Sequence, residues 1–201
     1  MNGLAFLKTA LGDHRIGAVT RSSPFVVDAL IRALPPNVQY VMEYGSGDGV
    51  VTTKLLRVLP PDGRVVGIEQ NAELVGELRR IVDGRFFAMH GDVFAALRNP
   101  HTIGLPRIDA VISAVPCTFL TPQQREEYVR LTHAVLAPSG RFIVYQYSRL
   151  MLPMLQKHFT QVKVSYVPLN FPPYFVMVAE KGGAVSPPPS EGEREGEGAW
   201  R

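Results

Sequence analysis

The pattern of hydrophobic and polar positions switches repeatedly between two periods along the chain. Short apolar runs, typical of buried strands, lie at residues 38–43, 64–68, 85–89, 108–113, 141–147, 161–167 and 174–180. Stretches with helical spacing of apolar residues lie at residues 24–34, 50–59, 72–82, 93–97, 122–136 and 150–158. Ser23 before Pro24 is typical of a helix start, and Pro35-Pro36 ends that first helix.

Strands that alternate with helices predict a doubly wound α/β fold, a Rossmann-like and mostly parallel sheet of seven strands with right-handed crossovers. The last two strands are joined by residues 168–173 without a helix, which predicts an antiparallel hairpin at one edge. We expect residues 35–181 to form this domain and residues 1–34 to add N-terminal helices. Residues 182–201 lack apolar periodicity, and we expect them to be disordered.

Composition narrows the class of protein. The chain has 201 residues, which suits one domain, and a formal net charge of +3. Its single cysteine, Cys117, excludes an internal disulfide and a cysteine-based zinc site, and the histidines lack metal-ligand spacing, so we expect no metal. No apolar run reaches the ~18 residues of a membrane span, and no secretory signal is visible. These features favour the cytoplasm.

The basic charge points to an anionic partner without identifying it. Without residues 182–201, 19 basic and 14 acidic residues remain, a net charge of +5 (21 − 2 basic, 18 − 4 acidic). Nucleic acid, a membrane surface and no special partner at all are each compatible with that charge.

An amphipathic pattern marks the N-terminal segment. Leu4, Leu7 and Leu11 form an apolar helical face, and Lys8 and Arg15 add positive charge near it. Such a helix is suited to weak contact with anionic head groups at a bilayer. It is equally suited to covering a bound cofactor, and a lid could do both.

The strongest chemical signal is Glu43-Tyr44-Gly45-Ser46-Gly47-Asp48-Gly49, directly after the first strand and at the start of a helix. Glycines at this turn let the backbone approach a ligand closely. The spacing is G-x-G-x-G rather than the dinucleotide G-x-G-x-x-G, which favours a ligand without a pyrophosphate. Glu43 would repel phosphate and attract the α-amino group of a methionine-type ligand.

Two further acidic residues follow the next two strands. Glu69 ends the second strand, with Gln70 after it, where a carboxylate can accept hydrogen bonds from ribose hydroxyls. Asp92 and Val93 follow the third strand, where a carboxylate could accept from an adenine amino group. Acidic residues at three successive strand ends form a pattern, and the set is a stronger signal than any one of its members.

These motifs resemble the class I S-adenosylmethionine-dependent methyltransferases. The resemblance covers about residues 38–180 and implies S-adenosylmethionine as the cofactor. In that family the glycines of the loop, the acid ending the second strand and the Asp after the third contact the cofactor. The expected cofactor-binding residues are Glu43, Gly45, Gly47, Gly49, Glu69, Gln70, Asp92, Val93 and Ser113.

A narrower resemblance is to bacterial phospholipid N-methyltransferases, which are similar to ribosomal-RNA adenine dimethylases but methylate phosphatidylethanolamine. It rests on Gly17-Ala18-Val19, Ser113-Ala114-Val115-Pro116, residues 141–147 and Asn170-Phe171-Pro172-Pro173. It implies successive methylation of phosphatidylethanolamine towards phosphatidylcholine. It also implies a phospholipid substrate at an anionic membrane surface, with the enzyme bound peripherally to the inner face of the cell membrane.

The residues after the fourth and fifth strands bear on the substrate. Base-amino methyltransferases commonly carry Asn or Asp followed by Pro-Pro-aromatic after the fourth strand, whereas this chain has Ser113-Ala114-Val115-Pro116-Cys117, which makes nucleic acid an unlikely partner. Tyr147, at the end of the fifth strand, could offer its face to a developing ammonium, a contact worth ~0.5–2 kcal/mol. We expect Tyr147 and Ser113 to contact the acceptor, with Tyr145 on the same face.

Three alternatives stay open from the sequence. The chain could be an rRNA adenine N6-dimethyltransferase, another small-molecule methyltransferase, or a non-catalytic module that binds a cofactor or a membrane. The oligomeric state is not encoded in any motif.

Overall fold

The computed structural model describes residues 22–170 and 172–183, and one seven-stranded sheet forms its centre. The strands are β1 (Tyr40–Tyr44), β2 (Arg64–Glu69), β3 (Phe86–His90), β4 (Ala110–Ser113), β5 (Arg141–Gln146), β6 (Gln161–Val167) and β7 (Tyr174–Glu180). The helices are α3 (Pro24–Ala33), α4 (Val50–Val58), α5 (Ala72–Leu78), α6 (Val93–Arg98), α7 (Pro122–Val135) and α8 (Leu152–His158). Two short 3-10 helices, η1 (Pro100–Ile103) and η2 (Cys117–Phe119), complete the described elements.

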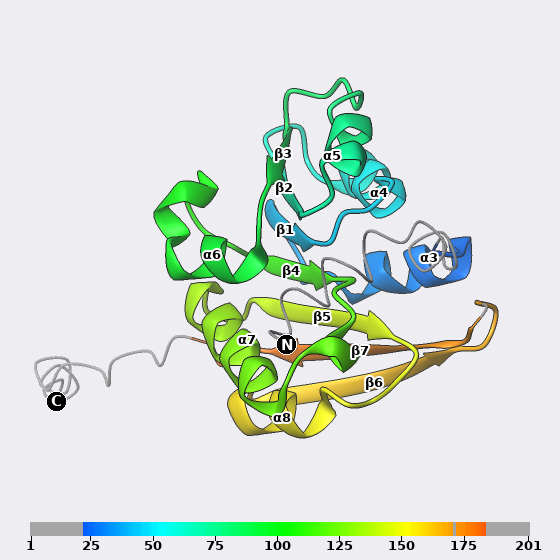
Figure 1. Ribbon diagram of the computed structural model, residues 1–201, viewed down its shortest axis with the longest axis vertical. Coiled ribbons are helices and arrows are strands. Elements are labelled where there is room, and N and C mark those ends of the chain that lie inside the picture. The colour runs from blue at the N-terminus through cyan, green and yellow to red at the C-terminus, as the bar shows by residue number, and fades with distance from the viewer. Residues whose placement is uncertain (1–21, 171, 184–201) are drawn as a thin grey trace, which may run out of the picture.

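The strand order is β3-β2-β1-β4-β5-β7-β6 (Figure 1). Strands β1 to β5 pair in parallel, while β7 pairs antiparallel with both β5 and β6. The predicted α/β fold and its antiparallel edge hairpin are therefore confirmed. The predicted helix over residues 4–11 and residues 184–201 of the predicted tail lie outside the described residues.

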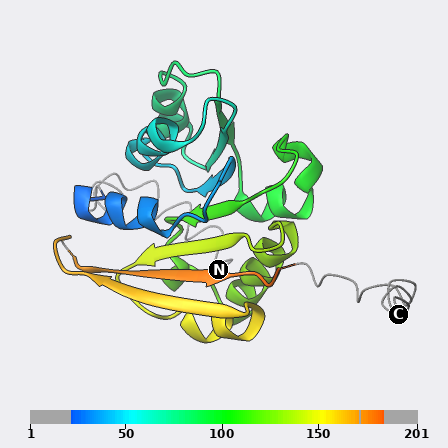
Figure 2. The same ribbon diagram turned by 180° about the vertical axis from the view of Figure 1, so that it is seen from behind.

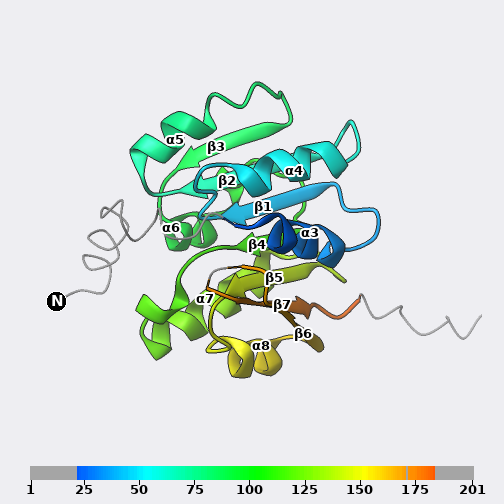
Figure 3. The same cartoon turned by 90° about the vertical axis from the view of Figure 1, so that its right-hand side faces the viewer.

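Helices cover both faces of the sheet, and each face has its own hydrophobic core. Helices α3 and α4 lie over β1 and its neighbours (Figure 3), with Val27, Leu30 and Leu55 among the side chains they bury. Helices α6, α7 and α8 cover the opposite face, where Tyr44, Tyr128 and other residues are buried. Successive side chains of a strand point to opposite faces of the sheet, so they pack alternately into the two cores.

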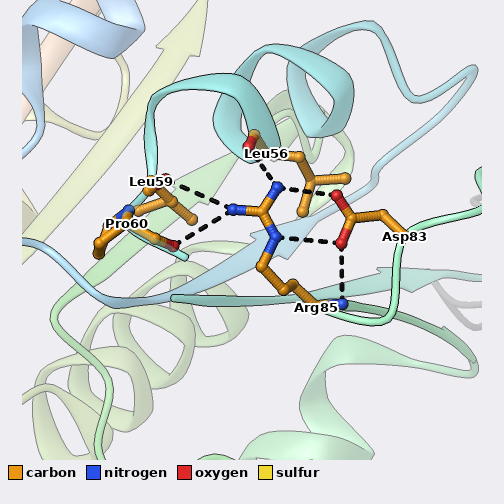
Figure 4. Close-up of polar contacts among 5 residues, drawn as sticks. All are labelled: Leu56, Leu59, Pro60, Asp83 and Arg85. Atoms are coloured by element: carbon orange, nitrogen blue, oxygen red, sulfur yellow. Dashed lines mark hydrogen bonds and ion pairs between the residues drawn. The ribbon is translucent and has the colours of Figure 1, made fainter. Parts of the chain in front are cut away.

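The connection from α5 to β3 differs from its prediction, because α5 ends at Leu78 rather than at residue 82. The Arg85 guanidinium accounts for the path of the following segment (Figure 4). It donates to the carbonyl oxygens of Leu56 (2.6 Å) and Pro60 (3.2 Å) at the end of α4, and to both carboxylate oxygens of Asp83. One side chain thus satisfies carbonyls that the helix end leaves without partners.

A buried carboxyl joins the first strand to the helix after the glycine loop. Glu43 is only 2% exposed, and the Thr52 hydroxyl of α4 donates to its Oε2 at 2.5 Å. Burial raises the pKa of Glu43 from 4.5 to about 8, although the hydrogen bond from Thr52 opposes that rise. At neutral pH the neutral, protonated form of this side chain is therefore favoured.

The raised pKa of Glu43 makes the stability of the protein depend on pH. Between pH 4.5 and about 8 the folded protein holds this proton more tightly than the unfolded chain does, so the free energy of unfolding falls as the pH rises through that window. The Glu43→Gln variant cannot ionise and should lose less stability over the same range. Urea unfolding near both ends of the window measures the difference. Glu77→Gln, on the exposed face of α5, is the matched control, and equal pH slopes for Glu43→Gln and the parent would contradict the assignment.

Candidate functional site

The loop between β1 and α4 is built from residues in left-handed backbone conformations. Gly45, Gly47 and Gly49 have φ values of 71°, 55° and 76°. Residues with a Cβ adopt such values at a cost, which explains why glycine alternates here. The Gly45 N–H donates to the carbonyl oxygen of Ile68 at 2.8 Å, which fixes the loop to β2 at the carboxyl edge of the sheet.

Glu69 holds this loop from the next strand. Its Oε2 accepts from the Gly47 N–H at 3.0 Å, and its Oε1 accepts from the N–H groups of Gln70 (2.8 Å) and Asn71 (2.9 Å). The residue is 7% exposed. A carboxylate offers about four acceptor sites, so three backbone donors leave room for a hydroxyl of a ligand.

Close packing under the loop leaves no room for a side chain on β2. A Cβ on Gly67 would overlap Ser46 Oγ and lie 3.2 Å from Ser46 Cβ. The glycine loop therefore lies directly on the β2 backbone. Gly67 was not singled out from the sequence, because nothing in a strand pattern shows which residue packs above it.

Asp92 lies at the carboxyl end of β3 and caps α6. Its Oδ1 accepts from the Ala95 N–H at 2.9 Å, and the Gln70 amide nitrogen lies 3.5 Å from its Oδ2. Val93 beside it is buried in the core under α6. The structure thus brings Glu69, Gln70 and Asp92 to one stretch of the sheet edge, next to the glycine loop.

Two more of the predicted side chains, those of Glu43 and Ser113, have hydrogen-bond partners within the fold. Glu43 lies beneath the glycine loop with Thr52 as its partner, and its predicted attraction to an ammonium group stays a prediction. The hydroxyl oxygens of Ser113 and Tyr128 lie 2.7 Å apart in the core, and Ser113 is fully buried. Its predicted contacts with cofactor and acceptor also stay predictions.

Tyr147 lies at the rim of this edge, immediately after β5. Its side chain is half exposed, and its hydroxyl oxygen is 3.1 Å from that of Thr118 in η2. Tyr145, by contrast, is buried on the face of the sheet that α3 covers. The centre of its ring lies 5.9 Å from the centre of the Tyr174 ring.

Residues 114–118 connect the two halves of the edge. At one end, a Cβ on Gly45 would lie 3.7 Å from the Cβ of Ala114, so this segment packs against the glycine loop. At the other end, the Thr118 hydroxyl is within hydrogen-bond distance of the Tyr147 hydroxyl. A ligand held by the glycine loop and a second molecule held near Tyr147 would therefore lie beside the same short segment.

Sequence reasoning missed one polar residue at the end of β5, directly before Tyr147. Gln146 ends β5 and is 5% exposed, and neither its amide nitrogen nor its amide oxygen has a hydrogen-bond partner within the described part of the chain. The nearby Ser148 hydroxyl also has none. Buried polar groups in native proteins are usually paired, so these atoms are suited to hydrogen bonds with a bound polar molecule. The signal in the sequence was an amide at the end of an otherwise apolar strand.

The edge as a whole suits a polar ligand that carries hydroxyls and positive charge. Glu69 and Asp92 supply carboxylates on the side of β1 to β3, and the glycine backbone permits close approach. Within residues 22–170 and 172–183, no group of three or more His, Cys, Asp or Glu side chains is arranged to hold a metal ion. No helix among these residues is both long and apolar enough to cross a membrane.

Comparisons with known proteins show which family the chain is similar to. Residues 41–140 match a family described as a methyltransferase domain. The ornithine lipid N-methyltransferase of Singulisphaera acidiphila is 28% identical over 166 residues, which cover 79% of this chain and 84% of that protein.

Solved structures share the fold at low sequence identity. The N-methyltransferase NodS from Bradyrhizobium japonicum, in complex with S-adenosylhomocysteine, superposes with a TM-score of 0.68 at 15% identity and covers 90% of this chain and 99% of its own. The O-methyltransferase TomG from Streptomyces achromogenes, in complex with S-adenosylmethionine, gives 0.63 at 17% identity, with 90% and 91% covered. The family match, the fold and the glycine loop together identify the chain as a class I S-adenosylmethionine-dependent methyltransferase that resembles lipid N-methyltransferases.

Proposed function

We propose that this methyltransferase transfers methyl groups to the amine nitrogen of a membrane lipid, with phosphatidylethanolamine and its methylated intermediates as substrates on the way to phosphatidylcholine. The observation that carries the proposal is the likeness to a lipid N-methyltransferase over 79% of the chain. Because that relative is named for ornithine lipid, an ornithine head group is the second candidate acceptor. Both present a primary amine attached to a lipid.

The cofactor would be held at the β1 to β3 side of the edge. Gly45, Gly47 and Gly49 would let it approach the backbone, Glu69 would accept from its ribose, and Asp92 with Gln70 would flank its adenine. When bound, S-adenosylmethionine supplies an electrophilic methyl group. Glu69 fits this task because its carboxylate keeps acceptor capacity beyond its three backbone donors.

The acceptor amine would lie near Tyr147. Transfer of a methyl group requires a neutral nitrogen aligned with the methyl, so the protein must orient the amine and remove water from it. The half-exposed Tyr147 ring offers a face to the positive charge that develops on the nitrogen, worth ~0.5–2 kcal/mol. Thr118 fixes the ring through its hydroxyl.

Gln146 is our candidate for binding the polar head group of the acceptor. Its carboxamide can both donate and accept, and the described residues supply neither kind of partner. A lipid amine could donate to its oxygen, while a phosphate or carboxylate of the head group could accept from its nitrogen.

We further propose that the enzyme works in the cytoplasm, peripherally at the inner face of the membrane. An amine lipid does not leave the bilayer in useful amounts, so the site must approach the surface. The N-terminal amphipathic segment predicted from the sequence is one means of attachment, and it lies outside the described residues.

Methyl transfer itself tests the proposal. Labelled S-adenosylmethionine should transfer its methyl to vesicles that contain phosphatidylethanolamine, and product analysis should show mono-, di- and trimethylated lipid. Parallel reactions with ornithine lipid and with undermethylated ribosomal RNA identify the acceptor. Label found in RNA alone, or cofactor binding without any methyl transfer, would contradict the proposal of a lipid acceptor.

The packing of Ser46 on Gly67 predicts the effect of one added methyl group. Gly67→Ala should displace the glycine loop, because its Cβ would overlap Ser46, and should weaken cofactor binding about tenfold or more, or ~1.4 kcal/mol. Calorimetry measures this affinity. Gly76→Ala is the matched control, because its Cβ would meet nothing within 4 Å in α5, and it should leave the affinity unchanged. Equal affinities for the two variants would show that the loop does not rest on β2 as described.

The unpaired amide of Gln146 predicts opposite effects on stability and activity. Gln146→Met keeps the shape of the side chain and removes two buried polar atoms, so the protein should become ~1 kcal/mol more stable. The same change should lower kcat/KM for the lipid about tenfold, with little change in cofactor affinity. Gln123→Met, on the exposed surface of α7, makes the same chemical change away from the edge. A Gln146→Met enzyme with parental kcat/KM would remove Gln146 from the acceptor site.

A further inference from the structure

Exposed apolar side chains gather at the rim of the sheet edge that carries the candidate site. They come from the start of α3, from the segment after β5 and from the β6–β7 hairpin, and each is between 37% and 60% exposed. We name this set the apolar rim, and its members are Phe25, Tyr147, Leu150, Tyr166 and Leu169. Exposed apolar side chains that gather in one region mark an interaction site more often than singly scattered ones do.

The strand register explains why these residues lie at one end. Gln146 at the carboxyl end of β5 pairs with Phe175 of β7, and Phe175 pairs with Tyr166 of β6. The hairpin end that follows therefore projects beyond β5, as Figures 1 and 2 show. The Ser23 backbone N–H donates to Asn170 Oδ1 at 3.0 Å, which brings the start of α3, with Phe25, to the same place.

Acidic residues are absent from the part of the chain that forms β5, β6 and most of β7. Residues 128–179 contain no Asp or Glu, and they contain five cations: Arg130, Arg141, Arg149, Lys157 and Lys163. Arg141 and Lys157 pair with acids outside that stretch. Arg149 lies at the rim, where its guanidinium stacks 5.4 Å from the centre of the Phe175 ring. The acidic side chains Glu69 and Asp92 belong to the other half of the edge, at β2 and β3.

The occupant that fits a rim of tyrosine, leucine, phenylalanine and arginine is the surface of an anionic bilayer. Tyrosine rings and arginine side chains place their apolar parts among lipid chains and keep their polar ends in the head-group layer. A second copy of this chain would bring like charges together at Arg149. A partner strand would meet Pro168, Pro172 and Pro173 at the hairpin end, which have no N–H to donate.

We infer that the apolar rim docks on the surface of an anionic lipid bilayer, with the hairpin end and the start of α3 as its contact points. This inference rests on the proposed function, because a lipid acceptor is what requires the site to face a membrane. Docking through the rim turns Tyr147 and the end of β5 towards the head groups. An amine lipid then reaches the site without leaving the bilayer.

Vesicle sedimentation of the full chain tests the rim. The probes are vesicles of phosphatidylcholine mixed equally with phosphatidylglycerol, and vesicles of phosphatidylcholine alone. The parent protein should sediment with the anionic vesicles and less with the neutral ones. The double variant Tyr166→Glu and Leu169→Glu should bind the anionic vesicles about tenfold less or weaker still, since it places two anions in the contact. Neither residue belongs to the proposed cofactor or acceptor site.

A matched control adds the same charges at the opposite end of the sheet. Val82 and Phe87 are 99% and 59% exposed near β3, and Val82→Glu with Phe87→Glu should leave vesicle binding at the parental level. Equal losses in both double variants would overturn the inference, since a general charge effect would then explain them. A change of oligomeric state confined to the rim variant, measured by sedimentation equilibrium, would also overturn it in favour of contact between copies.

The same variants separate this inference from the proposed function. In detergent-dispersed lipid, where no bilayer has to be approached, the rim variant should methylate at the parental rate. If no lipid is methylated under any condition while the rim variant alone loses vesicle binding, the proposed function fails and the docking surface stands. If lipid is methylated and the rim variant still binds vesicles like the parent, the docking surface fails and the function stands.

Discussion

One buried carboxylate, that of Glu69, holds together the edge of the sheet on which the site is built. It accepts from the backbone of the glycine loop through Gly47 and from the turn after β2 through Gln70 and Asn71. A buried charge is tolerated only when it is well hydrogen-bonded, and three backbone donors meet that condition here. Two loops from neighbouring strands are thereby fixed to a single side chain. The left-handed glycines and the packing of Ser46 on Gly67 accompany that arrangement and hold the loop close to the sheet.

Most of the fold could be predicted because the spacing of apolar residues distinguishes strands from helices along most of this chain. The differences arise where side chains far apart in sequence decide where an element begins or ends. Strand β4 begins at Ala110, and the carboxylate of Asp109 before it accepts from the backbone N–H groups of Gln39 and Tyr40. Helix α5 stops early where Arg85, across the turn, binds the end of α4. Local periodicity contains no information about such partners.

The arrangement of residues on the β1 to β3 side of the candidate site could be predicted, and the arrangement at the end of β5 much less. Glycine spacing and acids at strand ends are local signals, and the structure gathers Gly47, Glu69 and Asp92 as those signals required. Ser113 was predicted from its position alone, whereas its actual partner Tyr128 lies on a helix fifteen residues away. Gln146 was not predicted as a site residue, because its interest lies in an amide group without hydrogen-bond partners. Only the packed structure shows which polar atoms lack a partner.

The position of β7 has a consequence for how this protein is made. The final strand of the domain is an internal one, since it pairs with β5 on one side and β6 on the other. While the ribosome is still synthesising the chain, β5 has an open side and β6 has no neighbour at all. Non-local pairing of this kind forms late, and unpaired strands are prone to aggregate. The sheet can therefore be completed only after residues 174–180 have left the ribosome. A nascent chain that stalls before them exposes unpaired edges of β5 and β6, which are prone to aggregate.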